Sequence, residues 1–178
     1  WKSFTFGEDG EATPTAEAPT PASANPAMEP DEYAAKWGTE VSEVTIARIE
    51  AVLEGDGLPH GSSEFIAFTQ LEDIPFQVHR EPADAPWAQI ETRILPVGEG
   101  HTEASLQAIA NRWNTEHLQP TVFPIESEDG WILVAASRFF VGEGLSDRQI
   151  HAMLRRGLII GVSAAQEVPS FFDEASAE

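Results

Sequence analysis

Residues 106–134 read LQAIANRWNTEHLQPTVFPIESEDGWILV, a helical pattern followed by a break and a hairpin pattern. The apolar positions of the first half recur at spacings of three and four, which places them on one helix face: Leu106, Ile109, Ala110 and Trp113. Pro120 ends this helix, because its ring disfavours a helical conformation in the residues before it. Since the polar side chains lie largely off the apolar face, the stretch is predicted to be a structural amphipathic helix.

The second half of this stretch predicts a hairpin. Asp129-Gly130 stands between two apolar runs, and glycine tolerates the positive φ that a type I′ turn requires. Pro124 lies in the first arm and predicts an edge strand, because proline cannot donate to a strand ladder. Trp131, Leu133 and Ala135 fall on one face of the second arm. The other face is also apolar, so we expect the arm to be covered on both sides, by helices or by a partner.

Similar patterns extend outward from this stretch in both directions. Residues 44–53 carry apolar side chains at helical spacing, and Gly55 and Gly57 follow as a stop. Three segments have strand character: 64–71, 74–80 and 87–97. The last helix starts at a capping box, in which Ser146 bonds the backbone of Gln149 and Gln149 reaches back.

The order of elements is therefore α-β-β-β-α-β-β-α, an α+β fold with helices packed on a largely antiparallel sheet. The domain is placed at residues 42–172, with an acidic C-terminal tail at 173–178. Residues 1–41 form an extended Ala/Pro/Glu-rich tail with an aromatic start. Residues 8–32 have almost nothing to bury, which predicts a disordered linker.

The formal net charge of −20 narrows the classes of partner. A surface this acidic repels phosphate backbones and anionic lipid headgroups, so nucleic-acid and membrane-surface functions are not expected. A protein partner of basic chemistry is the natural complement, although the charge also serves solubility. The absence of cysteine fits a reducing compartment, and the sequence has no run of about 18 apolar residues. We therefore expect a cytoplasmic protein without membrane insertion.

Signatures of catalysis are missing from the sequence. It has no phosphate-binding loop, no dinucleotide fingerprint and no nucleophile elbow. The histidines are scattered, none at ligand spacing from another: His60, His79, His101, His117 and His151. His79 and His151 are expected to be surface or half-buried polar groups. We expect no catalytic residue, no metal and no cofactor.

Three strings resemble the YbjN domain family, whose members are described as sensory-transduction regulators: VTIARIEAVLEGDGLP (44–59), the opening stretch (106–134) and LSDRQIHAMLRRGLIIG (145–161). The likeness covers about residues 42–172. Its most specific piece is the helix that carries Asn-x-Trp-Asn before the Asp-Gly hairpin. The resemblance implies a fold like that of type III secretion chaperones, which are small, acidic, usually dimeric, and hold extended client segments along the sheet and its flanking helices.

The function expected from these observations is that of a non-enzymatic protein-binding module, chaperone-like or regulatory, which acts through a sheet edge and apolar pockets. Self-association as a homodimer through the helix bearing Trp113 is a further expectation. One alternative is an adaptor subunit of a larger assembly that docks through its aromatic tail. Another is a small-ligand-sensing regulator or an unrecognised hydrolase, which a deep pocket with convergent titratable groups would favour.

The candidate partner-binding residues are the tail and sheet aromatics Trp1, Phe4, Phe6, Trp87, Phe139 and Phe140. Core packing is the alternative role of the three sheet aromatics. The residues expected to act structurally are Trp113, Asn114, Asp129, Gly130, Ser146 and Gln149.

Overall fold

The computed structural model describes residues 4–6, 12–14, 36–80, 82, 84–96 and 101–175. The chain divides into two compact units, Trp1–Asp31 and Glu32–Glu178. In the first unit β1 (Phe4–Phe6) pairs antiparallel with β2 (Ala12–Pro14), a pair that the sequence did not predict. Three residues are too few to show the alternation that identifies a strand. Apart from β2, the predicted linker lies outside the described residues.

The second unit is built on a six-stranded antiparallel sheet with the order β3-β4-β5-β6-β8-β7. Its strands are β3 (His60–Ser62), β4 (Ile66–Leu71), β5 (Ile74–His79), β6 (Trp87–Ile94), β7 (Thr121–Ser127) and β8 (Gly130–Phe140). Its helices are α1 (Ile46–Gly55), α2 (Glu103–Glu116), α3 (Asp147–Glu167) and α4 (Ser170–Ala175). The predicted α+β class is confirmed, with β3 and α4 as additions, and β7 is the edge strand that Pro124 predicted.

The predicted hairpin around Asp129-Gly130 forms, although its turn differs from the prediction, and a second hairpin joins β4 to β5. Glu72 and Asp73 join β4 to β5 with φ of 50° and 63°, the positive values that a type I′ turn needs. Between β7 and β8 the two turn residues are Glu128 and Asp129, and Gly130 is already the first residue of β8, with φ of 117°. The prediction made Asp129 and Gly130 the two central residues of the turn. In the structure Asp129 is the second central residue, and Gly130 follows the turn and adopts the positive φ there.

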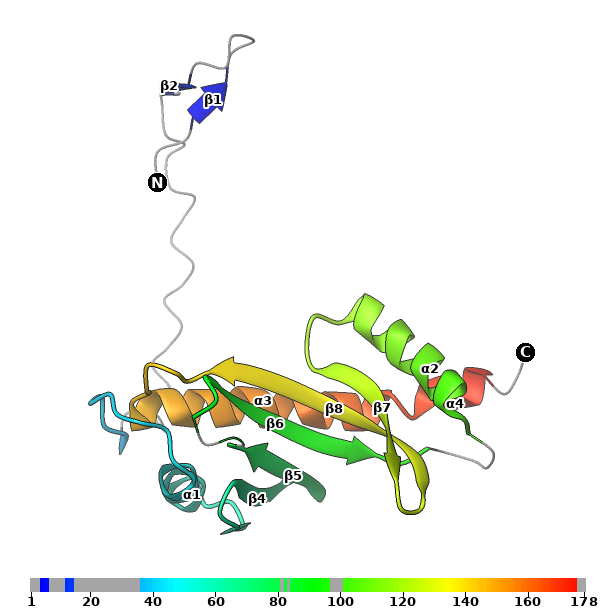
Figure 1. The fold of residues 1–178 in the computed structure, drawn as a ribbon, viewed down its shortest axis with the longest axis horizontal. Coiled ribbons are helices and arrows are strands. Elements are labelled where there is room, and N and C mark those ends of the chain that lie inside the picture. Colours follow the sequence, from blue (N-terminus) through cyan, green and yellow to red (C-terminus); the bar gives the residue numbers. More distant parts are fainter. Residues whose placement is uncertain are drawn as a thin grey trace. The chain divides into compact units, whose positions relative to one another are not determined.

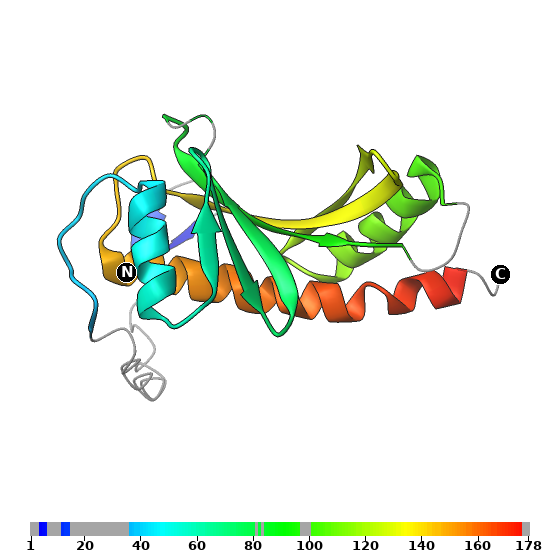
Figure 2. The same cartoon turned by 90° about the horizontal axis from the view of Figure 1, so that it is seen from below.

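The helices lie on one face of the sheet (Figures 1 and 2). One core cluster joins α1 and α3 to β4, β5 and β6, and a second joins α2, α4 and the end of α3 to β7 and β8. Trp131, Leu133 and Ala135 belong to the second cluster, as their shared face predicted. Helices therefore cover one face of β8, and within the described residues no helix covers the other.

α3 lies close against the sheet because two of its residues are glycines. A Cβ on Gly157 would lie 2.5 Å from Cδ1 of Ile90, and one on Gly161 would meet the ring of Phe76. The helix begins at the predicted capping box, in which the Ser146 and Gln149 side chains bond each other's backbone amides. In the part of the chain that the structure describes, none of the helices is both long and apolar enough to traverse a bilayer.

Candidate functional site

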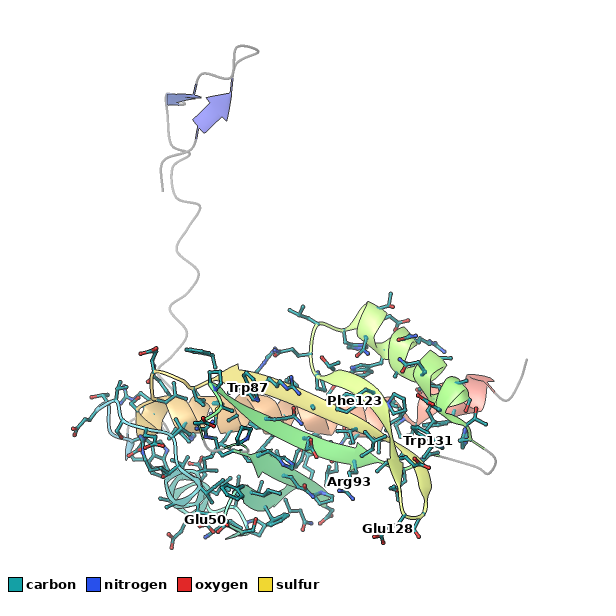
Figure 3. The ribbon with its side chains drawn as sticks, viewed as in Figure 1. Glu50, Trp87, Arg93, Phe123, Glu128 and Trp131 are labelled. Atoms are coloured by element: carbon teal, nitrogen blue, oxygen red, sulfur yellow. The ribbon has the colours of Figure 1, made fainter. Side chains whose placement is uncertain are left out.

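Strand register defines a face of the sheet that points away from the helices, here called the open face. Ala88, Ile90 and Ile94 of β6 are buried in the core, so the alternate residues of β6 point to the other side. Across the β6–β8 pair these residues form four rows: Trp87 with Phe140, Gln89 with Arg138, Glu91 with Ala136, and Arg93 with Val134. Figure 3 shows Trp87, Arg93 and Phe123 on strands that lie in front of α3.

The open face differs in charge from the chain as a whole. On strands β4 to β8, all of which are described, the register places a single carboxylate on this face, that of Glu91. Arg93 and Arg138 lie on the same face. The chain carries 30 acidic residues and a formal charge of −20. The open face is therefore nearly neutral, although the chain as a whole is strongly acidic.

A row of polar side chains crosses the centre of the open face. Arg138 Nε donates to Gln89 Oε1 at 2.7 Å, and Gln89 Nε2 donates to Glu91 Oε2 at 2.6 Å. The other carboxylate oxygen of Glu91 lies 3.2 Å from His79 Nε2. Burial raises the pKa of Glu91, but the contacts with His79 and Gln89 and the charges of His79 and Arg93 outweigh burial, so the net pKa lies below its ordinary value of 4.5.

Exposed aromatic side chains stand at one end of this polar row. Trp87 and Phe140 are cross-strand neighbours with 42% and 67% of their surface exposed. The guanidinium of Arg138 lies 5.9 Å from the centre of the Trp87 ring, within range of a cation–π contact. Large exposed apolar side chains that cluster on one face mark a surface that binds another molecule.

The open face is hollowed on both sides of the polar row. A cavity of about 430 Å³ lies where the loop after α2 meets β6, β7 and β8, and its lining includes Leu118, Phe123 and Arg138. Leu118 is 97% exposed at this rim. A smaller cavity of about 130 Å³ is lined on the other side by Phe68, Gln77, Glu91 and Arg93, among others. Hollows with mixed apolar and polar walls suit the side chains of a bound segment.

The sheet edges give less support to the expected strand addition. Asn114 occupies the outer edge of β7: its Nδ2 donates to Val122 O at 2.7 Å, and Val122 N donates to its Oδ1 at 2.8 Å. Two positions along, Pro124 has no N–H to offer. At the opposite edge β3 has three residues. The arrangement favours binding across the open face over pairing at an edge.

The structure separates the predicted partner-binding aromatics. Trp87 and Phe140 come together on the open face, as described above. Phe139 instead packs against the core cluster under α1 and α3, which is the core-packing alternative given for the sheet aromatics. Phe4 and Phe6 lie on β1 in the other unit, and Trp1 lies outside the described residues. The alternation of β strands sends neighbours such as Phe139 and Phe140 to opposite faces.

Some residues of the open face were missed by the sequence analysis. Phe68, Leu118, Phe123 and the polar row were not proposed for binding. The alternation along β4 and β7 could have assigned Phe68 and Phe123 to one face of the sheet. It could not say which face the helices leave bare.

Trp113 is buried inside its own chain. Its ring is 1% exposed, and its Nε1 donates to Pro120 O at 2.9 Å. The apolar face of α2 is packed against β7, β8 and α4, so self-association through this helix would use its polar side and stays a prediction.

The histidines form pairs and no larger constellation. His151 is buried, with Nδ1 2.7 Å from Asp56 Oδ2, which corrects the expectation of a surface or half-buried group. His79 is half-buried beside Glu91, as expected. His117 stacks on Trp113 with ring centres 3.6 Å apart. Among the described residues there is no group of three or more His, Asp or Glu side chains arranged to hold a metal ion.

The fold and this face define a class of α+β proteins in which helices back one side of an antiparallel sheet, while no helix among the described residues covers the other side. The family described as "Putative bacterial sensory transduction regulator" (YbjN) matches residues 45–168, and the chain belongs to this family.

The chain is also similar to two solved structures. One is the crystal structure of YbjN from E. coli, described as "a putative transcription regulator", with 13% identity over 74% of this chain and 93% of that chain and a TM-score of 0.56. The other is the HopA1-SchA chaperone-effector complex, with 11% identity over 70% of this chain and 91% of that chain and a TM-score of 0.49. No curated protein matches the chain.

Proposed function

We propose that this chain is a non-enzymatic protein-binding module with a regulatory or chaperone-like role, and that its partner binds on the open face. One observation carries the proposal: helices cover one side of the sheet, while the other side presents exposed aromatics and a single, paired carboxylate. An uncovered sheet face with this composition resembles the centre of an interface, where aromatic residues and arginine are enriched and carboxylates are depleted.

The partner's contacting segment is proposed to be apolar and extended. Trp87 and Phe140 offer aromatic anchors of the kind that dominate binding energy. The polar row of Gln89 and Arg138 can hydrogen-bond a backbone that crosses the strands. The partner is also expected to carry basic groups. These groups would contact the surface of this chain around the open face, where the excess of carboxylates lies.

Two further observations support the regulatory role and the location. The family to which the chain belongs is described as a sensory transduction regulator, which is a regulatory description and not an enzymatic one. The absence of cysteine fits a reducing compartment, so we propose that the module acts in the cytoplasm.

Site-specific photo-cross-linking in the native host tests the proposal. A photoreactive phenylalanine analogue placed at Phe140 or Phe123 is expected to capture the same partner protein. The analogue at Glu50, a half-buried residue of α1 away from the open face, is the control and is expected to capture none of it. Equal capture at Glu50, or no capture at either open-face position, would contradict the assignment.

The adaptor alternative rests on the aromatic tail. Phe4 and Phe6 lie on a strand that has its own pairing with β2, so this segment is a structured candidate for recognition. Removing residues 1–35 separates the two functions. Loss of the partner captured at Phe140 would favour the adaptor, and unchanged capture would favour the open face.

A further inference from the structure

The surface of α3 that faces away from the sheet carries a stripe that the proposed function does not use. Arg148, Ala152, Arg155 and Ile159 are exposed and follow one another at spacings of four, three and four, which aligns them on one helix face. Ile159 is 53% exposed. A large aliphatic side chain at the centre of an exposed charged stripe calls for a partner surface.

A cavity of about 330 Å³ lies directly beside Ile159, between α3, the loop after α1 and the β4–β5 turn. Its walls are mainly apolar and include Leu58, Leu71, Leu154 and Leu158, with Ile159 at the rim. A branched aliphatic side chain is much smaller than this volume. The same surface thus presents both an apolar projection and an apolar hollow that could receive one.

The charges on this surface are divided along the helix. The first half of α3 carries Arg148, Arg155 and Arg156, and α3 has no carboxylate between Asp147 and Glu167. Near the C-terminal end of α3, Gln166 Nε2 donates to Glu72 Oε2 at 3.1 Å. The Glu72 carboxylate therefore lies at the end of the helix that carries Glu167. Asp147 at the first end is paired with Arg48, and Glu167 accepts from Ser163 Oγ and lies 3.8 Å from His117 Nε2. The three arginines therefore make one end of the stripe basic, and Glu72 is the main acidic group at the other end.

A surface that holds a projection beside a hollow, and a basic end opposite an acidic end, is complementary to itself under a two-fold rotation. In an isologous contact, residue i of one copy meets residue j of the other, and the reverse holds equally. Two α3 helices placed antiparallel bring each basic half beside the other copy's acidic end. Each Ile159 then faces the other copy's cavity.

We propose that this chain forms a two-fold dimer through the outer face of α3, with Ile159 of each copy seated in the cavity of the other. The net charge of −20 opposes the contact of two copies, and this stripe is a surface on which arginines offset that repulsion. The dimer leaves both open faces directed outward, since α3 covers the opposite side of the sheet. Two outward faces would bind a repetitive or elongated partner with avidity.

Sedimentation equilibrium of the full chain, from low to high micromolar concentration at about physiological salt, tests the dimer. The wild type is expected to show a monomer–dimer equilibrium. Ile159→Asp is expected to weaken dimerisation at least about tenfold, and Ile159→Leu to preserve it. Since Ile159 is largely exposed, its replacement leaves the core intact, and an unchanged circular dichroism spectrum checks this.

A charge exchange tests the antiparallel arrangement. Replacing Arg155 and Arg156 by Glu is expected to weaken the dimer about tenfold, and adding Glu72→Lys and Glu167→Lys to restore it at least in part. Trp87→Asp on the open face is the matched control and should leave the dimer unchanged.

Three outcomes would overturn the dimer: a monomer mass throughout the concentration range, a wild-type dimer in Ile159→Asp, or a dimer lost in Trp87→Asp. The first two outcomes leave the open face as the site of partner capture untouched, so the two proposals fail separately; the third would make the open face the contact between copies.

Discussion

Arg48 shows how a single side chain holds distant parts of this fold together. Its guanidinium donates to Ser42 O and Glu43 O at 2.8 and 2.7 Å, to Leu145 O at 2.8 Å, and to Asp147 Oδ1 at 2.6 and 3.1 Å. These partners lie before α1 and at the start of α3. The planar fork of arginine satisfies all of them at once, which a single ammonium group cannot do.

Arg48→Lys is therefore expected to destabilise the protein by about 2 kcal/mol, because most of these charge-assisted hydrogen bonds are lost. Urea unfolding monitored by tryptophan fluorescence measures the change in the midpoint at constant slope. Arg93→Lys, an exposed change on the open face, is the control and is expected to stay within about 0.5 kcal/mol. Equal stability of Arg48→Lys and wild type would mean that the carbonyls find other donors.

Glu91 gives a prediction with a defined pH dependence. Its pKa in the folded state is lowered below the ordinary value of 4.5, so its ionised form stabilises the fold above about pH 4.5. This contribution is lost as the pH falls through the lowered pKa. Glu91→Gln is expected to cost about 1–2 kcal/mol at pH 7 and progressively less below pH 4.5, where the wild-type carboxyl also becomes neutral.

Unfolding curves collected from pH 7 to about pH 3 check this sign. Glu126→Gln, on the exposed part of β7, is the matched change and is expected to remain within about 0.5 kcal/mol of wild type. A stability difference for Glu91→Gln that grew as the pH fell would show that the network does not favour the charged form of Glu91.

The sequence predicts a residue's role best when its hydrogen-bond partner is nearby in the chain. Ser146 and Gln149 cap each other across three residues, and Trp113 bonds Pro120 seven residues away. Arg48 and Asp147 are 99 residues apart, and His151 and Asp56 are 95 apart. No local pattern reports such distant pairings, so Arg48 was missed and His151 was expected to be a surface or half-buried group.

At the scale of elements, the contact of α3 with the sheet depends on glycine. Gly161→Ala should gain up to about 1 kcal/mol of helix propensity. The added methyl group would meet the ring of Phe76, which is buried and has little room to move. Since overpacking costs about 1–3 kcal/mol, we expect a net destabilisation of about 1 kcal/mol.

A double-mutant cycle isolates this contact. In a Phe76→Leu background, where the ring is absent, Gly161→Ala is expected to become neutral or stabilising. Thermal unfolding of the two single variants, the double variant and the wild type gives the coupling. Additive effects would mean that the helix moves away from the sheet instead of clashing with Phe76.

Long periodic elements were predicted well, and short ones were not. The helices α1, α2 and α3 and the hairpins β4–β5 and β7–β8 all match patterns of several residues. β3 has three residues, His-Gly-Ser, and exists because β4 pairs with it. α4 follows Pro169 and packs through Phe172 into the second core cluster, a tertiary contact that the sequence pattern did not show. The open face was missed for the same reason, because β8 is apolar on both sides.

At the scale of the whole molecule, the distribution of charge organises the surface. Carboxylates dominate the chain, yet on the two surfaces proposed for binding, the open face and the outer stripe of α3, arginines balance them. Repulsion between copies with this much net charge disfavours nonspecific association. Contact is favourable only at surfaces where the local charge is balanced.

The same excess of charge predicts how the stability of the fold responds to salt. Ion pairs of Lys or Arg with Asp or Glu among the described residues include Lys36–Asp56, Arg48–Asp147 and Arg112–Glu116, but the chain has 30 acidic against 10 basic residues and a formal charge of −20. Repulsion among the remaining carboxylates should therefore exceed attraction. Raising the salt from about 0.01 to about 0.1 M shortens the Debye length from about 30 to about 10 Å and is expected to raise the urea midpoint.

A matched variant identifies the origin of the salt effect. Glu50→Gln together with Glu54→Gln removes two negative charges from α1 and should be more stable than wild type at low salt, with a smaller gain on adding salt. A midpoint that fell as sodium chloride was added would mean that ion pairs such as Arg48–Asp147 outweigh the repulsion among the carboxylates. The fold would then owe more to those pairs than its net charge implies.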